Sequence, residues 1–136
     1  MKRIFIAIAT CGVIVVAGCG GVAVSSSAAS PSPRAVSTAA QLEFAVRAYS
    51  AAFLDGHAKA AWMLRSKASQ QGESYAQFYV VVKQAQAIYG DATMTSLKVV
   101  RLAGRHALVT YRYDVGDIDQ VRQPWVLESG RWRVKN

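Results

Sequence analysis

The chain has 136 residues, a length that accommodates one globular domain. Lys and Arg number 16 against 8 Asp and Glu, a net charge of +8, and the apolar share of 52% excludes a disordered polar chain. Two Cys and two His residues supply no zinc-ligand set at workable spacing, and no Gly-rich phosphate loop or hydrolase motif occurs. We therefore expect neither a metal nor a cofactor.

The N-terminal segment has the features of a secretory signal. Lys2 and Arg3 provide a positive start, and residues 4–16 form an apolar stretch. That stretch is too short to cross a hydrocarbon core of about 30 Å as a helix. An uncleaved anchor, or a signal cut by the ordinary peptidase, remains an alternative reading of these features.

The four residues Val16-Ala17-Gly18-Cys19 resemble the lipobox of bacterial lipoproteins. The resemblance implies that the Cys19 thiol receives a diacylglyceryl group and that cleavage follows Gly18. Two acyl chains anchor a protein stably, whereas a single chain holds it reversibly. We therefore expect a lipid-anchored protein on the extracytoplasmic face of the cell membrane, with membrane lipid as its partner through acylated Cys19.

Composition divides the chain into three parts. Residues 1–18 are predicted to be the lipoprotein signal peptide. Residues 19–36 comprise the lipidated Cys and a tether rich in Ser, Ala and Pro, without helical or strand period. Residues 37–136 form the domain, which is long enough to bury a single core.

Three helices are predicted in the first half of this domain. Apolar residues recur at three- and four-residue steps from Thr38 to an Asp-Gly turn at residues 55–56. A second, shorter helix fits residues 57–68. The Ser-x-x-Gln pattern at residues 74–77 is a capping box, and it opens a third helix through Tyr89.

After Gly90 the hydrophobic pattern changes from helical spacing to alternation, which indicates strands. The alternation is clearest in the second strand and predicts a sheet with one buried face. In the last strand Trp132 and Val134 are expected to point inward. Four strands are expected, over residues 93–102, 107–115, 121–128 and 131–135.

This order of elements resembles the nuclear-transport-factor-2-like superfamily, also called the cystatin-like or ketosteroid-isomerase-like fold. Residues 124–134, with a Trp-x-Leu segment, a Gly turn and a Trp-Arg-Val strand, are similar to the last hairpin of many bacterial members. Residues 52–62 resemble the junction of their first two helices. The chain looks closest to small actinobacterial envelope lipoproteins. The resemblance implies an α+β, cone-shaped domain in which three helices pack on a curved four-stranded antiparallel sheet.

Members of this superfamily enclose a conical cavity between the helices and the sheet. Seven aromatic residues of this chain are placed to line it. They are either an apolar ligand pocket with phenol hydroxyls as orienting groups or a filled core. These residues are Tyr49, Phe53, Trp62, Tyr79, Tyr111, Tyr113 and Trp125.

Enzymes of the superfamily, such as ketosteroid isomerase, use buried carboxylates in that cavity. The positions of this chain predicted to face inward on the strands carry no Asp, Glu or His. We therefore expect no catalytic residues and no enzyme activity.

Positive charge is expected to gather on the outward face of the sheet. Such a face would meet anionic head groups or acidic wall polymers, or it is an ordinary solvated surface. Nucleic acid is excluded as a partner by export. The residues concerned are Arg112, Arg122, Arg131, Arg133 and Lys135.

These observations favour a membrane-tethered domain that binds an apolar small molecule or an envelope protein. The alternative is a structural or assembly component of an envelope transport or secretion machine. An enzyme of the ketosteroid-isomerase type is the third and least favoured hypothesis.

Overall fold

The computed structural model describes residues 38–136. The predicted signal peptide, its cleavage site after Gly18, the acylated Cys19 and the tether lie outside the described residues. The described part is an α+β domain with these elements in chain order: α1 (Thr38–Leu54), α2 (Ala58–Met63), α3 (Lys67–Gly72), α4 (Tyr75–Tyr89), β1 (Met94–Ala103), β2 (His106–Tyr113), η1 (Gly116–Ile118), β3 (Gln120–Glu128) and β4 (Arg131–Val134).

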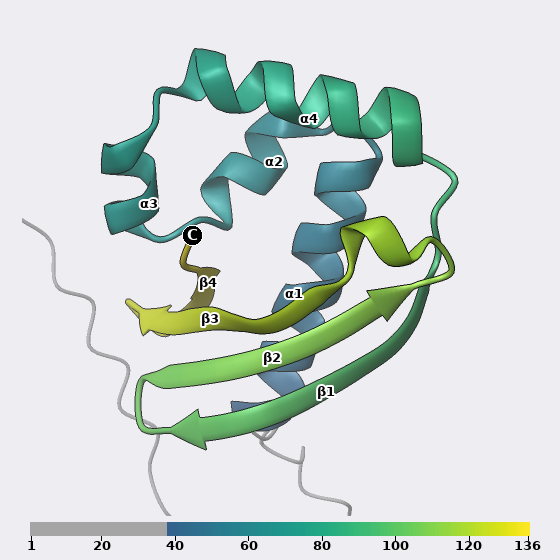
Figure 1. Cartoon of the computed structure of the whole chain (residues 1–136). Helices are drawn as coiled ribbons and strands as arrows, with labels where there is room; N and C mark the ends of the chain where they lie inside the picture. The colour runs from purple at the N-terminus through teal and green to yellow at the C-terminus, as the bar shows by residue number, and fades with distance from the viewer. Residues whose placement is uncertain (1–37) are drawn as a thin grey trace, which may run out of the picture. The chain divides into compact units, whose positions relative to one another are not determined.

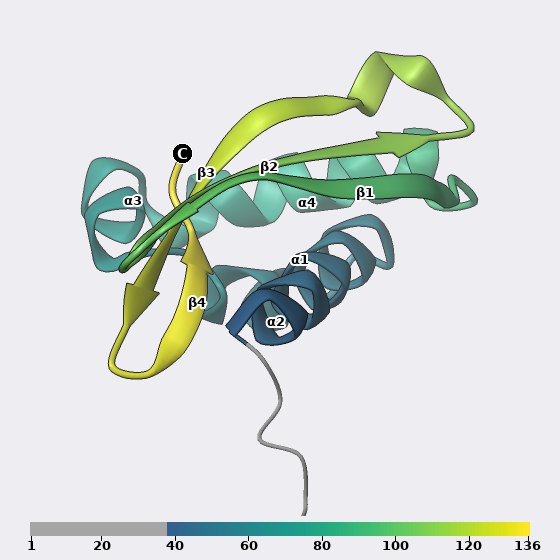
Figure 2. The same ribbon diagram turned by 90° about the horizontal axis from the view of Figure 1, so that it is seen from below.

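The four strands form one antiparallel sheet in the order β1-β2-β3-β4, as the hydrophobic alternation predicted. Figure 1 shows the sheet lying across α1, while α4 runs along the upper ends of α1 and α2. Seen from below, α1 lies against one face of the sheet and the β3–β4 hairpin bends toward α1 (Figure 2). One face of the sheet is therefore covered by helix and the other faces solvent.

The core lies between α1 and the inner face of the sheet. Leu42, Val46 and Tyr49 recur at three- and four-residue steps on α1 and are buried. On the sheet side they meet alternate residues of β2 and β4, including Val109 and Val134, both fully buried. The apolar stripe of the helix and the apolar face of the sheet thus cover one another.

The strand phase predicted from alternation is confirmed. Ala107, Val109 and Tyr111 are buried on β2, and Trp132 and Val134 are buried on β4. The second strand ends at Tyr113, two residues earlier than predicted, because the Asp119 carboxylate accepts the Tyr113 backbone N–H at 2.8 Å. The chain then turns through η1 instead of continuing the strand.

The prediction of one helix over residues 57–68, and so of three helices, is wrong. Residues 38–136 form four α-helices, because α2 ends at Met63 and α3 begins at Lys67. Between them, the Ser66 N–H donates to the Val134 carbonyl at 2.8 Å and the Val134 N–H donates to the Leu64 carbonyl at 2.9 Å. Pairing with β4 takes up backbone groups that a continuous helix would have used internally.

The capping box predicted for the long third helix is confirmed at the start of α4. The Ser74 hydroxyl accepts the Gln77 backbone N–H at 3.2 Å, and the Gln77 side chain accepts the Ser74 backbone N–H at 3.1 Å. Among residues 38–136, no helix is both long enough and apolar enough to cross a membrane.

Candidate ligand-binding pocket

A pocket lies between α1, α4 and the inner face of the sheet. Its volume is about 550 Å³, and it is partly open to solvent. Ligand-binding clefts commonly occupy about 300–1,000 Å³. Tyr49 and Phe53 from α1, Ile88 from α4, and Tyr111 and Tyr113 from β2 all contribute to its wall. The space is large enough for a small organic molecule and accessible to it.

Four of the seven aromatic residues expected in the cavity line this pocket: Tyr49, Phe53, Tyr111 and Tyr113. Trp125 is instead fully buried in the core, with its ring edge-on to Tyr49 at 6.1 Å between centroids. It therefore belongs to the core between α1 and the sheet and not to the pocket wall.

Trp62 and Tyr79 also lie outside the pocket lining. The Trp62 ring packs against Phe78 at 5.3 Å and against Tyr75 at 5.6 Å. Tyr79 is 45% exposed on the outer side of α4. Two residues further on, the helix has turned by about 200°, so Val81 is directed to the pocket.

The tyrosine hydroxyls in the pocket differ in their partners. The Tyr113 hydroxyl lies 2.5 Å from the Ser50 hydroxyl. The Tyr111 hydroxyl has no hydrogen-bond partner within the described residues. Burial raises the pKa of the Tyr49, Tyr111 and Tyr113 hydroxyls. All three phenols are therefore neutral at physiological pH, and Tyr111 has a hydroxyl proton available to a ligand.

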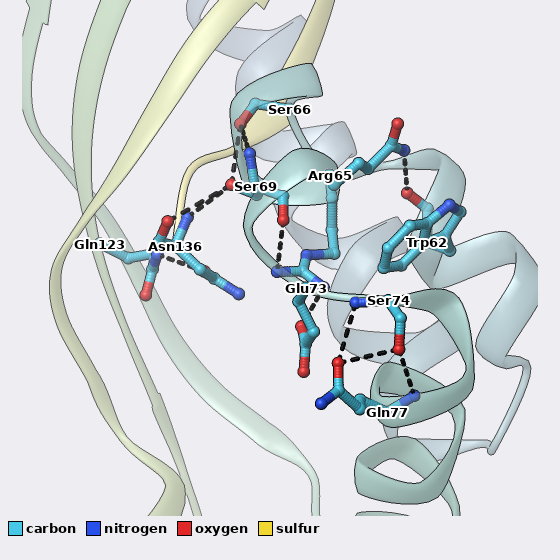
Figure 3. Close-up of polar contacts among 10 residues, drawn as sticks. Trp62, Arg65, Ser66, Ser69, Glu73, Ser74, Gln77, Gln123 and Asn136 are labelled. Carbon is cyan, nitrogen blue, oxygen red and sulfur yellow. Dashed lines mark hydrogen bonds and ion pairs between the residues drawn. The ribbon is translucent and has the colours of Figure 1, made fainter.

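One end of the pocket is polar and centres on Arg65, which follows α2. Its side chain is 4% exposed and its guanidinium contacts the Glu73 carboxylate at 2.5 Å. The guanidinium carbon lies 5.1 Å from the centre of the Trp62 ring and 4.6 Å from that of Phe78. Figure 3 shows Arg65 and Glu73 directed toward one another.

Two amide side chains complete this polar end. The Gln123 side chain donates to the Asn136 side-chain oxygen at 2.9 Å, and the Asn136 backbone N–H donates to the Ser69 hydroxyl at 3.0 Å. Ser69 in turn accepts, through its carbonyl, a 3.3 Å hydrogen bond from Arg65 (Figure 3). Residues of three separate segments are thereby joined into one network that borders the pocket.

The sequence analysis missed Arg65 and Glu73. Arg65 lies between α2 and α3, and Glu73 lies between α3 and the capping box of α4. Neither segment has a hydrophobic periodicity that would predict where its side chains point. The strands carry no acidic residue toward the pocket, as expected, but Glu73 reaches it from this connection. An Arg beside an N-cap Ser was the one local signal for the break at this point.

Away from Arg65 the lining combines apolar side chains with polar ones, because Gln120, whose side chain donates to the Ile118 carbonyl at 3.1 Å, also lines the pocket. Leu54 closes α1, Ile88 lies in the last turn of α4 and Ile118 belongs to η1. Ile88 is 69% exposed and Val81 is 45% exposed, although both line the pocket. Apolar side chains left uncovered at the mouth of a cleft favour an apolar occupant.

The five basic residues expected on one surface are not equally free. Arg112 pairs with the Asp119 carboxylate at 3.0 Å, and the Arg133 guanidinium donates to the Met63 carbonyl at the end of α2. The side chains of Arg122, Arg131 and Lys135 are exposed. Two of the five charges are therefore engaged within the domain.

A second concavity of about 620 Å³ lies between α1 and the β3–β4 turn. Phe44 and Ala48 from α1 face Gly130, Arg131 and Trp132 across it. The Phe44 ring is 76% exposed, the largest exposure among the exposed large apolar residues of the described part.

Within residues 38–136 no cluster of three or more His, Cys, Asp or Glu side chains is arranged to hold a metal ion. The Glu73 carboxylate is paired with Arg65 and is therefore not a free base. No family model and no curated protein matches this chain.

Proposed function

We propose that this protein is a lipoprotein of the cell membrane whose extracytoplasmic domain binds an apolar small molecule. The pocket of about 550 Å³ carries the binding part of the proposal. The lipobox-like segment ending at Cys19 supports the anchor. The antiparallel meander packed on helices, with a pocket between α4 and the sheet, supports the cone-shaped fold of the nuclear-transport-factor-2-like superfamily.

Binding, not catalysis, follows from the chemistry of the lining. Its phenols are neutral, and its carboxylate is neutralised by the Arg65 guanidinium at 2.5 Å. A general base needs a carboxylate or imidazole free to accept a proton. The same groups are well suited to hold a ligand through hydrogen bonds.

The anchor is tested by replacing Cys19 with Ala in the full chain. Wild-type protein should incorporate labelled palmitate and sediment with membranes, whereas the variant should incorporate none. Labelling that persists in the Cys19→Ala variant, or its absence from wild type, contradicts the lipoprotein assignment. Cys11→Ala is the matched control and should be labelled like wild type.

The pocket is tested with two variants of α4, each of which replaces an exposed aliphatic residue with Asp. Ile88 lines the pocket, whereas Val80 is 52% exposed on α4 and does not line it. In the full chain, Ile88→Asp should weaken binding of an apolar fluorescent dye by about tenfold. The bound dye would cover the introduced carboxylate and remove part of its hydration. Val80→Asp should leave binding unchanged. Equal binding by both variants would remove the pocket as the site.

Exposed Phe44 favours a second candidate function, binding of an envelope protein as a component of a transport or secretion assembly. The partner would bring an apolar side chain to the concavity beside Phe44 and an acidic residue to the exposed Arg131. A photo-cross-linker placed at Phe44 should then join one protein in near-stoichiometric amount. The same group at exposed Lys59 on α2 should not.

A further inference from the structure

Helix α4 lies on the outside of the domain, yet it lacks the charged face of an ordinary surface helix (Figure 1). Lys83 is the single charged residue among its 15. Phe78 and Val82 are the residues that it buries, whereas Tyr75 and Tyr79 remain 41% and 45% exposed. A helix that is apolar on most of its surface is normally covered on more than one side. The uncovered side of α4 is therefore suited to a further contact.

Three aromatic rings form a continuous strip across α2 and α4. Between ring centroids, Trp62 lies 5.6 Å from Tyr75, and Tyr75 lies 6.3 Å from Tyr79. Tyr75 and Tyr79 are four positions apart and therefore lie on one face of α4. None of the three rings lines the pocket. This aromatic strip (Trp62, Tyr75 and Tyr79) is therefore a surface separate from the proposed ligand site.

Positive charge flanks the aromatic strip at both ends. Lys59 is three positions before Trp62 on α2, and Lys83 is four positions after Tyr79 on α4, so each lies on the helix face of its aromatic neighbour. Both Lys residues are exposed, and neither forms an ion pair within the described residues. The sequences of α2 and α4 contain no Asp or Glu. The strip and its flanks are therefore apolar and cationic, without an acidic group from either helix.

These residue types are those of a membrane–water interface. Trp and Tyr gather where lipid head groups meet acyl chains, because their rings are apolar and their N–H and O–H groups stay hydrated. The Tyr75 and Tyr79 hydroxyls have no hydrogen-bond partner within the described residues, so water or head groups can satisfy them. Lys lays its alkyl stem on apolar surface and keeps its ammonium at the level of the lipid phosphates. A bilayer that contains anionic lipid matches both properties of the strip.

The proposed anchor places a bilayer within reach of the aromatic strip. Between Cys19 and the start of α1 lie 18 residues, and a chain of that length spans up to about 60 Å. α1 has 17 residues and is therefore about 25 Å long. α4 crosses the end of α1 that lies opposite Thr38 (Figure 1). The chain is thus long enough for α4 to touch the bilayer that holds Cys19, which the anchor keeps at a high effective concentration, whereas a second protein would have to be recruited.

We infer that the aromatic strip is a membrane-contact surface. Trp62, Tyr75 and Tyr79 enter the head-group region of the bilayer that holds Cys19, and Lys59 and Lys83 contact its anionic phosphates. This inference rests on the proposed anchor and goes beyond it, because an anchor alone leaves the domain free to face any direction.

Photo-cross-linking identifies what covers the strip. Benzoylphenylalanine is placed at Tyr79 of the full chain, in bacterial cells whose phospholipids carry radioactive phosphate. Illumination should attach labelled phospholipid to this protein, whereas the proposed diacylglyceryl anchor contains no phosphate and adds no label. Lys98 is the control position, because it pairs with Thr110, next to buried Val109, and so lies exposed on the outer face of the sheet. The same group at Lys98 should gain no label.

Each other outcome contradicts the inference. An adduct of Tyr79 with a second copy of the chain or with another protein, equal lipid labelling at both positions, or no adduct at Tyr79 would overturn the membrane contact. If wild-type protein in the same cells incorporates palmitate, such a result leaves the anchor intact. Absence of palmitate contradicts the anchor and this inference together.

Trp62 reports the same contact without a cross-linker. Trp125 and Trp132 are 1% and 3% exposed, so half-buried Trp62 is the indole that lipid can approach. In nanodiscs of brominated phospholipid, the wild-type full chain should lose part of its Trp emission, and Trp62→Phe should lose none.

Two Asp variants complete the test. Tyr79→Asp should remove most of the quenching, because its carboxylate is costly to dehydrate and is repelled by lipid phosphates. Val121→Asp, which also introduces Asp at an exposed apolar residue, lies on β3 and should keep the wild-type quenching. Emission of wild-type protein that brominated lipid does not quench, or equal quenching in the two Asp variants, would overturn the inference.

Discussion

The Ser50 hydroxyl of α1 and the Tyr113 hydroxyl at the end of β2 lie 2.5 Å apart. This contact ties the helix to the sheet beside the pocket, and it occupies the hydroxyl of Tyr113. Tyr111, two residues earlier on the same face of the strand, has no such partner within the described residues. The alternation of the strand places both tyrosines on the same face, yet their hydroxyls have different roles.

Replacing each tyrosine with Phe should separate these roles. Tyr113→Phe leaves the buried Ser50 hydroxyl without its partner and should lower the free energy of unfolding by about 0.5–1.5 kcal/mol. Tyr111→Phe removes an unpartnered hydroxyl and should not destabilise the domain, but it should weaken binding of a pocket ligand that accepts a hydrogen bond from that hydroxyl. Urea denaturation and dye displacement measure the two effects. Identical results for both variants would contradict the assignment.

The buried phenols predict a loss of stability in alkali. Burial raises the pKa of Tyr49, Tyr111 and Tyr113 in the folded protein, whereas the unfolded chain ionises them near the ordinary value of 10.0. Below that pH the folded and the unfolded chain both keep these phenol protons, so the three tyrosines do not change the free energy of unfolding with pH. As the pH rises above it, the unfolded chain alone releases protons, so the free energy of unfolding falls.

Urea denaturation over an alkaline pH series, followed by tyrosinate absorbance, measures this effect. Ionisation of the three phenols should coincide with unfolding. Tyr111→Phe should reduce the slope of stability against pH, because one proton fewer is released. A slope unchanged by that substitution would show that Tyr111 does not contribute.

Gly56 and Gly72 provide a matched pair of substitutions. Gly56 has φ +75°, and a Cβ there would lie 1.9 Å from the Gln86 side-chain oxygen. Gly56→Ala should therefore destabilise the domain by about 1–2 kcal/mol from the backbone conformation alone. A Cβ at Gly72, in the last position of α3, meets no atom within 4 Å. Gly72→Ala should be neutral or slightly stabilising, as thermal denaturation would show.

The last strand carries a test of core packing. Trp132 is 3% exposed, and Trp132→Ala should cost about 3–5 kcal/mol. Arg131→Ala, at an exposed neighbouring position, should change stability by less than about 0.5 kcal/mol. Arg133→Ala should fall between them, at about 0.5–1.5 kcal/mol, because its guanidinium donates to the Met63 carbonyl. Equal midpoints of thermal denaturation for the Trp132 and Arg131 variants would contradict this arrangement of the strand.

The features that the sequence predicted correctly depend on neighbours along the chain. The Ser74–Gln77 capping box involves residues three positions apart, and the inward phase of Val109 and Tyr111 follows from strict alternation. Helix and strand periods are local properties, so the extent of α1, the start of α4 and the buried face of the sheet could be read directly.

The tertiary structure decided where the helical region breaks and which polar residues reach the pocket. α2 stops because the backbone around Leu64 and Ser66 pairs with Val134, about 70 positions away in the chain. That break places Arg65 against Trp62 and Phe78 and opposite Glu73. Hydrophobic periodicity in the sequence does not predict this backbone pairing, because the paired groups become neighbours only after the sheet has packed on the helices.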